Sequence, residues 1–325
     1  MDGKKRRTIL GSRPHHGGGS YFACGSGILA PSKKGLEKDL KSAVLAPLEH
    51  LIEEAPEFVP GQIAYARALK RYGQTEKATR RIEAAATRYP GNAALKAAQV
   101  ELLESQEKWL RASIAARQYA LTHPEASDSA RFAQLADQNM ERYKSDLKAE
   151  ITGSAVASEF LGALTGQEGQ TAQLAALMLK GESQVGKQVA NSKREQAPLI
   201  KEKAVVNYIN EVGQNLAELM GRSEFNYKFY VIDKDTFNAS AYPGGKIFVH
   251  SGALKAMESE AELAGLLAHE IAHAVASHSY RSIAEDILLQ NLGQAIPFGK
   301  VISELASLRY DAKMSARQIY LDFML

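Results

Sequence analysis

The sequence predicts an α+β fold in which a run of paired helices precedes a smaller domain that combines helices with a short sheet. Three observations predict it. Prolines recur 34 residues apart, at positions 56, 90 and 124. The later part of the chain instead follows the order helix, strand, strand and helix. The last of these helices begins with a capping box and places two histidines on one face.

Composition limits the classes of protein that the chain can represent. Its 325 residues are 45% hydrophobic and 24% charged, which is typical of a globular protein long enough for two domains. The net charge is only +3 and no helix carries a basic stripe, so nucleic acid is not expected as a partner. No run of 18 uncharged apolar residues occurs, so no membrane span is predicted. The single cysteine, Cys24, excludes an internal disulfide framework.

Residues 1–35 are predicted to be a disordered tail rich in glycine and histidine. Lys4 to Arg7 resembles the charged start of a signal peptide, and Tyr21 to Gly25 loosely resembles a lipoprotein cleavage site. Neither has the hydrophobic stretch that such a signal needs. Either the start codon is misplaced or the protein is not exported through this sequence.

Residues 36–150 are predicted to form tetratricopeptide-like helical repeats. The 34-residue spacing is the period of that helix-turn-helix unit, and Gly73 falls where its two helices would turn. Alanines recur at the same offset and would let neighbouring helices approach closely: Ala64 and Ala98, Ala78 and Ala112, Ala86 and Ala120. The aromatic positions of the repeat are only partly filled. An unrelated helical bundle with prolines spaced by chance therefore stays open.

Residues 151–195 are predicted to be a helical connector, and residues 196–325 a mixed domain. The elements predicted in that domain are a helix over Lys203–Gly221, a strand over Phe225–Asp233, a turn at Pro243–Gly245 and a strand over Lys246–His250. A further helix follows, so the order of elements is that of an α+β domain.

The predicted helix after Ser259 carries the residues with the clearest chemistry. Ser259 and Glu262 form the capping box that starts it. His269 and His273 are four residues apart, about 400° of helical turn, so both imidazoles face one metal ion. Glu270 lies beside that ion, where it would take a proton from a water activated by the metal and pass it to the leaving amine. The alternative is an ordinary helix with two hydrogen-bonded histidines.

Other histidines do not complete this site by sequence pattern. His278 is five residues past His273 and about 140° further round the same helix, so it is not expected to be a ligand. The metzincin pattern needs Gly and His at the positions that Ala276 and Ser279 occupy.

The segments Asn238–Gly252 and Glu260–His273, followed by His278, resemble peptidase family M48 over about residues 180–310. This family includes the CAAX prenyl protease, the heat-shock protease HtpX and quality-control proteases of mitochondria and the periplasm. The resemblance implies a zincin-type metallopeptidase domain with one Zn²⁺ per chain. It implies His269 and His273 as ligands and Glu270 as the catalytic base.

The resemblance also implies how substrates and partners would bind. In the family, the Pro-Gly-Gly turn leads into an edge strand that holds the substrate backbone by strand addition. That role would fall to residues Gly245, Lys246, Ile247, Phe248 and Val249. Protein or peptide substrates are expected, and the helical repeats would recruit protein partners. The family members without a membrane span favour the cell envelope or periplasm as the compartment.

The sequence departs from the family at the third zinc ligand, a Glu in the motif E-x-x-A-D-x-x-G, which is absent. Glu304 is not expected to replace it. Our leading explanation is a frameshift after Met314. With suitable synonymous codons, one inserted G restores Met-Glu-Arg-Gln-Ala-Asp-Ile-Phe-Gly. Two hypotheses follow: a zinc metalloendopeptidase in protein quality control, or an inactive binding or chaperone-like protein.

Overall fold

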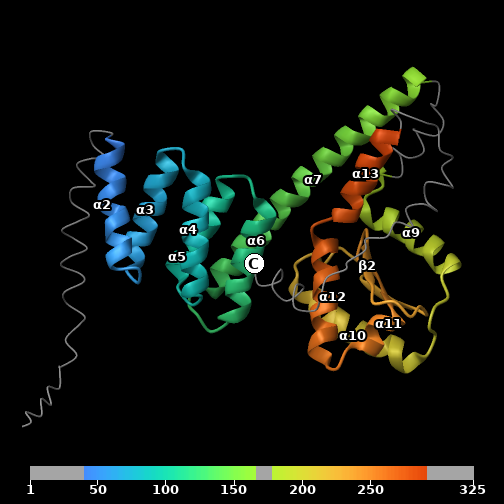
Figure 1. Cartoon of the computed structure of the whole chain (residues 1–325). Coiled ribbons are helices and arrows are strands. Elements are labelled where there is room, and N and C mark those ends of the chain that lie inside the picture. Colours follow the sequence, from blue (N-terminus) through green and yellow to red (C-terminus); the bar gives the residue numbers. More distant parts are fainter. Residues whose placement is uncertain (1–39, 166–177, 291–325) are drawn as a thin grey trace, which may run out of the picture. The chain divides into compact units, whose positions relative to one another are not determined.

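A computed structural model of the chain describes residues 40–165 and 178–290, with side chains described over 40–153 and 178–284 (Figure 1). The chain divides into two compact units after Ala136. The predicted tail, Glu304 and the segment after Met314 lie outside the described residues. None of the helices over 40–165 and 178–290 has the length and apolar character needed to cross a membrane.

The first unit is built from helical pairs. Its helices are α2 (Lys41–Glu54), α3 (Val59–Arg71), α4 (Thr75–Arg88), α5 (Ala93–Glu104), α6 (Trp109–Thr122) and the start of α7 (Ser129–Thr165). Helix α3 packs on α4 and α5 on α6. Gly73 turns the chain between α3 and α4 with a φ of 73°, a conformation that glycine adopts without strain.

The core of the first unit explains the regular spacing seen in the sequence. Pro56, Pro90 and Pro124 lie in the connections before α3, α5 and α7. Ala78 and Ala112, which are 34 residues apart, are both fully buried. The helical pairs agree with the predicted fold class, while the tetratricopeptide identity of the repeats and the predicted domain boundaries stay predictions.

The second unit is mixed, as the sequence predicts. After the rest of α7 it contains α9 (Glu182–Gln196), α10 (Lys203–Leu219), β1 (Lys228–Ile232), β2 (Ala239–Tyr242), β3 (Lys246–His250), α11 (Ser251–Ala256), α12 (Glu260–Val275) and α13 (His278–Gln290). The α+β class is therefore confirmed. Strand β2 was not predicted, because four residues before a tight turn carry little period-two pattern.

The three strands form one sheet in the order β1-β3-β2. Strand β3 pairs in parallel with β1 over all five of its residues and antiparallel with β2 over Lys246 to Val249. Its residues are all buried. The expectation that Gly245 to Val249 form an edge strand for the substrate backbone is therefore wrong, because both sides of β3 are already paired.

The outer side of β1 is also occupied. The Asn210 side chain of α10 donates to the Phe229 carbonyl at 2.9 Å and accepts from the Phe229 N–H at 3.2 Å. The Ile200 N–H donates to the Val231 carbonyl at 2.9 Å. Strand β2 is therefore the edge of the described sheet that faces the helix α12, on which it packs.

Helix α9 holds the turn between β2 and β3 by close backbone contact. A Cβ added at Gly186 of α9 would lie 1.8 Å from the Pro243 carbonyl oxygen. Gly244 and Gly245 of the same turn have φ values of 65° and 74°, in the left-handed region that favours glycine. The spacing between α9 and the turn therefore depends on the missing side chain at Gly186.

We expect the substitution Gly186→Ala to lower the free energy of unfolding by about 1–3 kcal/mol, because the added methyl group forces the turn away from α9. Gly265→Ala is the matched control: Gly265 is also helical, and nothing lies within 4 Å of its added Cβ. The control should gain up to about 1 kcal/mol from helix propensity. Urea denaturation of both variants measures the two changes, and equal stabilities would contradict the contact.

Candidate metal centre

Helix α12 carries the candidate centre, and its start is fixed locally. The Ser259 hydroxyl accepts from the Glu262 N–H at 3.3 Å, and the Glu262 carboxylate accepts from the Glu258 N–H at 2.9 Å. This is the predicted cap, with the return bond one residue earlier than in the standard capping box. The face turned to the core consists of Leu263, Leu266, Leu267, Ala268, Glu270, Ile271, Ala274 and Val275.

The two predicted histidines converge. The Nε2 atoms of His269 and His273 are 3.0 Å apart, and the two rings meet edge to face with centroids separated by 4.6 Å. Two nitrogen ligands at 2.0–2.1 Å from one tetrahedral zinc ion lie about 3.4 Å apart. The separation of the Nε2 atoms is within a few tenths of an ångström of that value, so the pair fits as two ligands of one ion.

Glu270 lies between the histidine pair in sequence, but its side chain is buried, with 3% of its surface exposed. It contacts strand β2, since its carboxylate accepts a hydrogen bond from the Ala241 N–H. Burial raises the pKa of Glu270 to about 8, against the lowering effect of that hydrogen bond. A carboxyl with such a pKa can accept and release a proton near neutral pH.

The environment of His273 favours its neutral form. Burial is the main cause, and the neighbouring His269 and His278 add to it, so that the pKa of His273 falls to about 4. Histidine binds a metal ion through the unprotonated nitrogen. His273 is therefore in its metal-binding protonation state throughout the physiological pH range.

The sequence pattern misplaced His278. Helix α12 ends at Val275, and Ser277 has a φ of 54°, which breaks the helical path before α13 begins. As a result the Nδ1 atoms of His278 and His273 are 2.7 Å apart. The closeness of His278 to His273 depends on this helix break. The sequence does not predict the break, because a serine in the left-handed region leaves no clear pattern.

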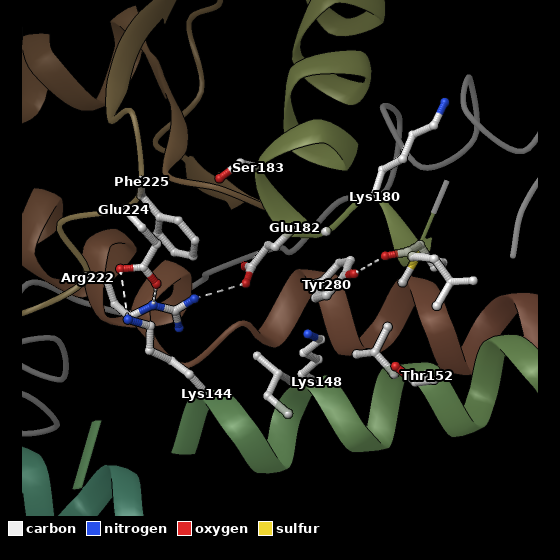
Figure 2. Close-up of a pocket in the computed structure, with 15 residues that line it drawn as sticks. Lys144, Lys148, Thr152, Lys180, Glu182, Ser183, Arg222, Glu224, Phe225 and Tyr280 are labelled. Atoms are coloured by element: carbon white, nitrogen blue, oxygen red, sulfur yellow. Dashed lines mark hydrogen bonds and ion pairs between the residues drawn. The ribbon is translucent and has the colours of Figure 1, made fainter. Parts of the chain in front are cut away.

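A buried network holds this break in place. Arg222 donates to the Val275 carbonyl at 2.8 Å and to the Ser277 hydroxyl at 3.2 Å. The Ser277 hydroxyl donates to Glu182 at 2.7 Å, and Arg222 reaches the same carboxylate at 3.3 Å. Figure 2 shows the guanidinium of Arg222 between the carboxylates of Glu182 and Glu224. None of these network residues was identified from the sequence.

The same network borders a cavity of about 340 Å³. Apolar side chains of α7, such as Leu147 and Ile151, line it. Tyr280 of α13 lines it as well (Figure 2). Lys144 and Lys148 lie at its side. The lining includes neither His269, Glu270 nor His273, so the cavity is not the candidate centre.

Within the described residues, no group of three or more histidine, cysteine, aspartate or glutamate side chains is placed to hold a metal ion. Among the described residues, the candidate metal ligands are thus the imidazoles of His269 and His273, and Glu270 lies beside them. Neutral nitrogen donors of this kind suit zinc.

The buried carboxyl of Glu270 makes stability depend on pH in the metal-free protein. The pKa of this group is about 8 in the folded chain and 4.5 in the unfolded chain, so the folded state carries the extra proton between these values. Raising the pH from 6.5 to 8 removes that proton and lowers the free energy of unfolding. The shift at His273 acts below pH 6.5 and does not oppose this effect.

We therefore expect the melting midpoint of the metal-free protein to fall between pH 6.5 and 8. The Glu270→Gln variant should lose less stability over the same range, because its amide does not ionise. Glu262→Gln, at an exposed position of the same helix, serves as the control and should follow the parent. Thermal melts in chelator-containing buffers measure this, and equal pH slopes for all three proteins would refute the burial effect.

A helix with the pattern H-E-x-x-H beside an edge strand defines the class of zinc-type metallopeptidase domains. Residues 203–323 match the model of peptidase family M48. This match agrees with the resemblance that the sequence motifs predict.

The relatives carry protease names. The chain is 30% identical to the beta-barrel assembly-enhancing protease of Yersinia pestis over 159 residues, 49% of this chain and 32% of that protein. It is 42% identical to the mitochondrial metalloendopeptidase OMA1 of Schizosaccharomyces pombe over 77 residues, 24% of this chain and 23% of that protein. Human OMA1 is 37% identical over 76 residues, 23% of this chain and 14% of that protein. The match thus spans about a third or less of each relative.

Proposed function

We propose that this chain is a zinc-dependent metalloendopeptidase that cleaves protein substrates in protein quality control. The observation that carries the proposal is the convergence of the His269 and His273 Nε2 atoms at 3.0 Å, beside the buried Glu270. Both histidines would hold the ion. Zinc, when bound, acidifies a water ligand and polarises the substrate carbonyl.

Glu270 would act as the general base in this proposal. Its carboxylate accepts the proton of the attacking water and then delivers it to the nitrogen of the leaving amine. The position of Glu270 against the Ala241 N–H supports this role, because it places the base at the strand that borders the site.

Strand β2 would hold the substrate backbone. The sheet has its remaining edge at Ala239–Tyr242, and an extended peptide adds to such an edge through main-chain hydrogen bonds. The Ser279 hydroxyl donates to the Ala241 carbonyl at 2.5 Å and the Ala241 N–H donates to Glu270, so a bound peptide would exchange with both contacts. The helical pairs of the first unit would recruit partners, and the cell envelope is the proposed compartment.

Zinc titration of the full chain against a chromogenic chelator tests the proposal. We expect one zinc per chain, lost in His269→Ala and in His273→Ala. The affinity should be below that of sites with three protein ligands, because the described residues supply two. Zinc binding that neither substitution changes would overturn the ligand assignment.

A second candidate function is binding of unfolded chains without hydrolysis. It is supported by the histidine pair having no third protein ligand within the described residues. A zinc-loaded chain that suppresses aggregation of an unfolded protein but releases no peptides would favour this function. Release of peptides, blocked by a chelator and restored by zinc, would favour the peptidase.

A further inference from the structure

His278 contacts His273 on the side of the ring away from the candidate ion. The Nδ1 atoms are 2.7 Å apart, and the ring centroids are 4.9 Å apart at 66°. The other nitrogen of the same ring, Nε2 of His273, faces Nε2 of His269. An ion between the two Nε2 atoms is therefore out of reach of the His278 Nδ1 atom, so this contact does not make His278 a third ligand.

The short contact requires one proton between the two rings. Two ring nitrogens at 2.7 Å form a hydrogen bond only if one of them carries the proton. A neutral His273 that presents its Nε2 lone pair to a metal carries its proton on Nδ1. It must then donate to the unprotonated Nδ1 of His278.

The fold holds this contact from outside the helix. Tyr143 of α7 donates to the Ala276 carbonyl at 2.6 Å, and Arg222 donates to the Val275 carbonyl at 2.8 Å. Together with the φ of 54° at Ser277, these bonds set the direction in which α13 starts. His278 is the first residue of that helix, so its ring position is determined by tertiary contacts.

We propose that His278 is a positioning residue that fixes the tautomer and ring orientation of His273 for metal binding. The consequence for metal affinity rests on the proposed metallopeptidase function. The tautomer rests on it as well, whereas the hydrogen bond stands on the 2.7 Å contact alone. Partners of this kind typically change metal affinity by about 10–100-fold when they are removed.

Three variants of the full chain test the proposal. His278→Phe keeps a ring but has no acceptor, and His278→Ala removes the ring at an exposed position. His278→Asn restores an acceptor oxygen near the place of Nδ1. His123→Phe is the matched control, since His123 stacks on Tyr119 in the first unit, with ring centroids 4.8 Å apart.

Zinc affinity, measured by competition with a chromogenic chelator, should fall about 10–100-fold in His278→Phe and His278→Ala. His278→Asn should recover most of the loss, and His123→Phe should bind as the parent does. Metal-free melting midpoints should stay close to the parent, which separates positioning from a loss of folding. Unchanged zinc affinity in both Phe and Ala variants, or no recovery with Asn, would overturn the proposal.

Nitrogen-15 NMR of the metal-free chain gives a readout that needs no zinc. The parent should show His273 protonated at Nδ1, and His278→Phe should lose that preference. If the parent binds no zinc, the proposed function fails, yet the tautomer of His273 still decides this inference. A His273 protonated at Nε2 in the parent, or the same tautomer in all variants, would contradict it.

Discussion

Replacing Glu270 with glutamine is expected to lower peptide hydrolysis by the zinc-loaded chain by at least about 10²–10⁴-fold, the usual contribution of a general base. The amide keeps the size of the side chain and its contact with β2, but it cannot take up the proton of the attacking water. Zinc affinity should remain near that of the parent, since Glu270 is not proposed as a ligand.

The measurement is release of peptides from an unfolded protein substrate, with zinc content determined on the same samples. Glu262→Gln is the control, because this exposed residue lies in the first turn of the same helix, about 10 Å along the helix axis from His269. Substantial turnover by Glu270→Gln with zinc bound would remove Glu270 from the catalytic role. Loss of zinc together with turnover would instead point to a ligand role.

Replacing Arg222 with methionine is expected to cost about 3–5 kcal/mol in the free energy of unfolding, as for a buried ion pair with one partner removed. The side chains of Arg222 and Glu182 are only 4% and 7% exposed. Burial already raises the pKa of Glu182, against the lowering effect of Arg222. Without the guanidinium, the carboxylate loses its charged partner and keeps the Ser277 hydroxyl as a donor, and the Val275 carbonyl loses its bond from Arg222.

Urea denaturation of Arg222→Met, Glu182→Gln and the double variant measures the coupling. We expect the double variant to lose less than the sum of the single losses, because no unpaired charge remains buried. Lys255→Met breaks the exposed Lys255–Asp235 pair, whose side chains are 66% and 83% exposed, and should leave the free energy of unfolding close to that of the parent. Equal losses in Arg222→Met and Lys255→Met would contradict the role assigned to the buried network.

The features that the sequence predicts well are those set by local geometry. The common face of His269 and His273 follows from the 3.6-residue period of the α-helix, and the capping box at Ser259 follows from local capping preferences. Both are found in the structure. The strand Lys246–His250 was located from its own apolar pattern with its observed bounds. The central place of this strand in the sheet was not predicted, because the apolar pattern of one strand does not show which neighbouring strands pair with it.

Other features depended on residues far apart in the chain. The pKa of Glu270 reflects burial against β2, and β2 lies at an edge of the sheet because β3 pairs with both of the other strands. The sequence placed His278 about 140° round a continuous helix from His273 and so gave no reason to count it as a ligand. The structure instead breaks the helix at Ser277 and brings the two rings together.

The sequence by itself thus determined the two-part organisation, the peptidase family motif and the pair of imidazoles on one helical face. Only the tertiary structure decided which strand forms the open edge, how deeply Glu270 is buried and where His278 lies. The physical reason is the distance along the chain over which each interaction acts. Helical periodicity and capping act within one or two turns, whereas Tyr143 and Arg222 fix the end of α12 from 133 and 53 residues away.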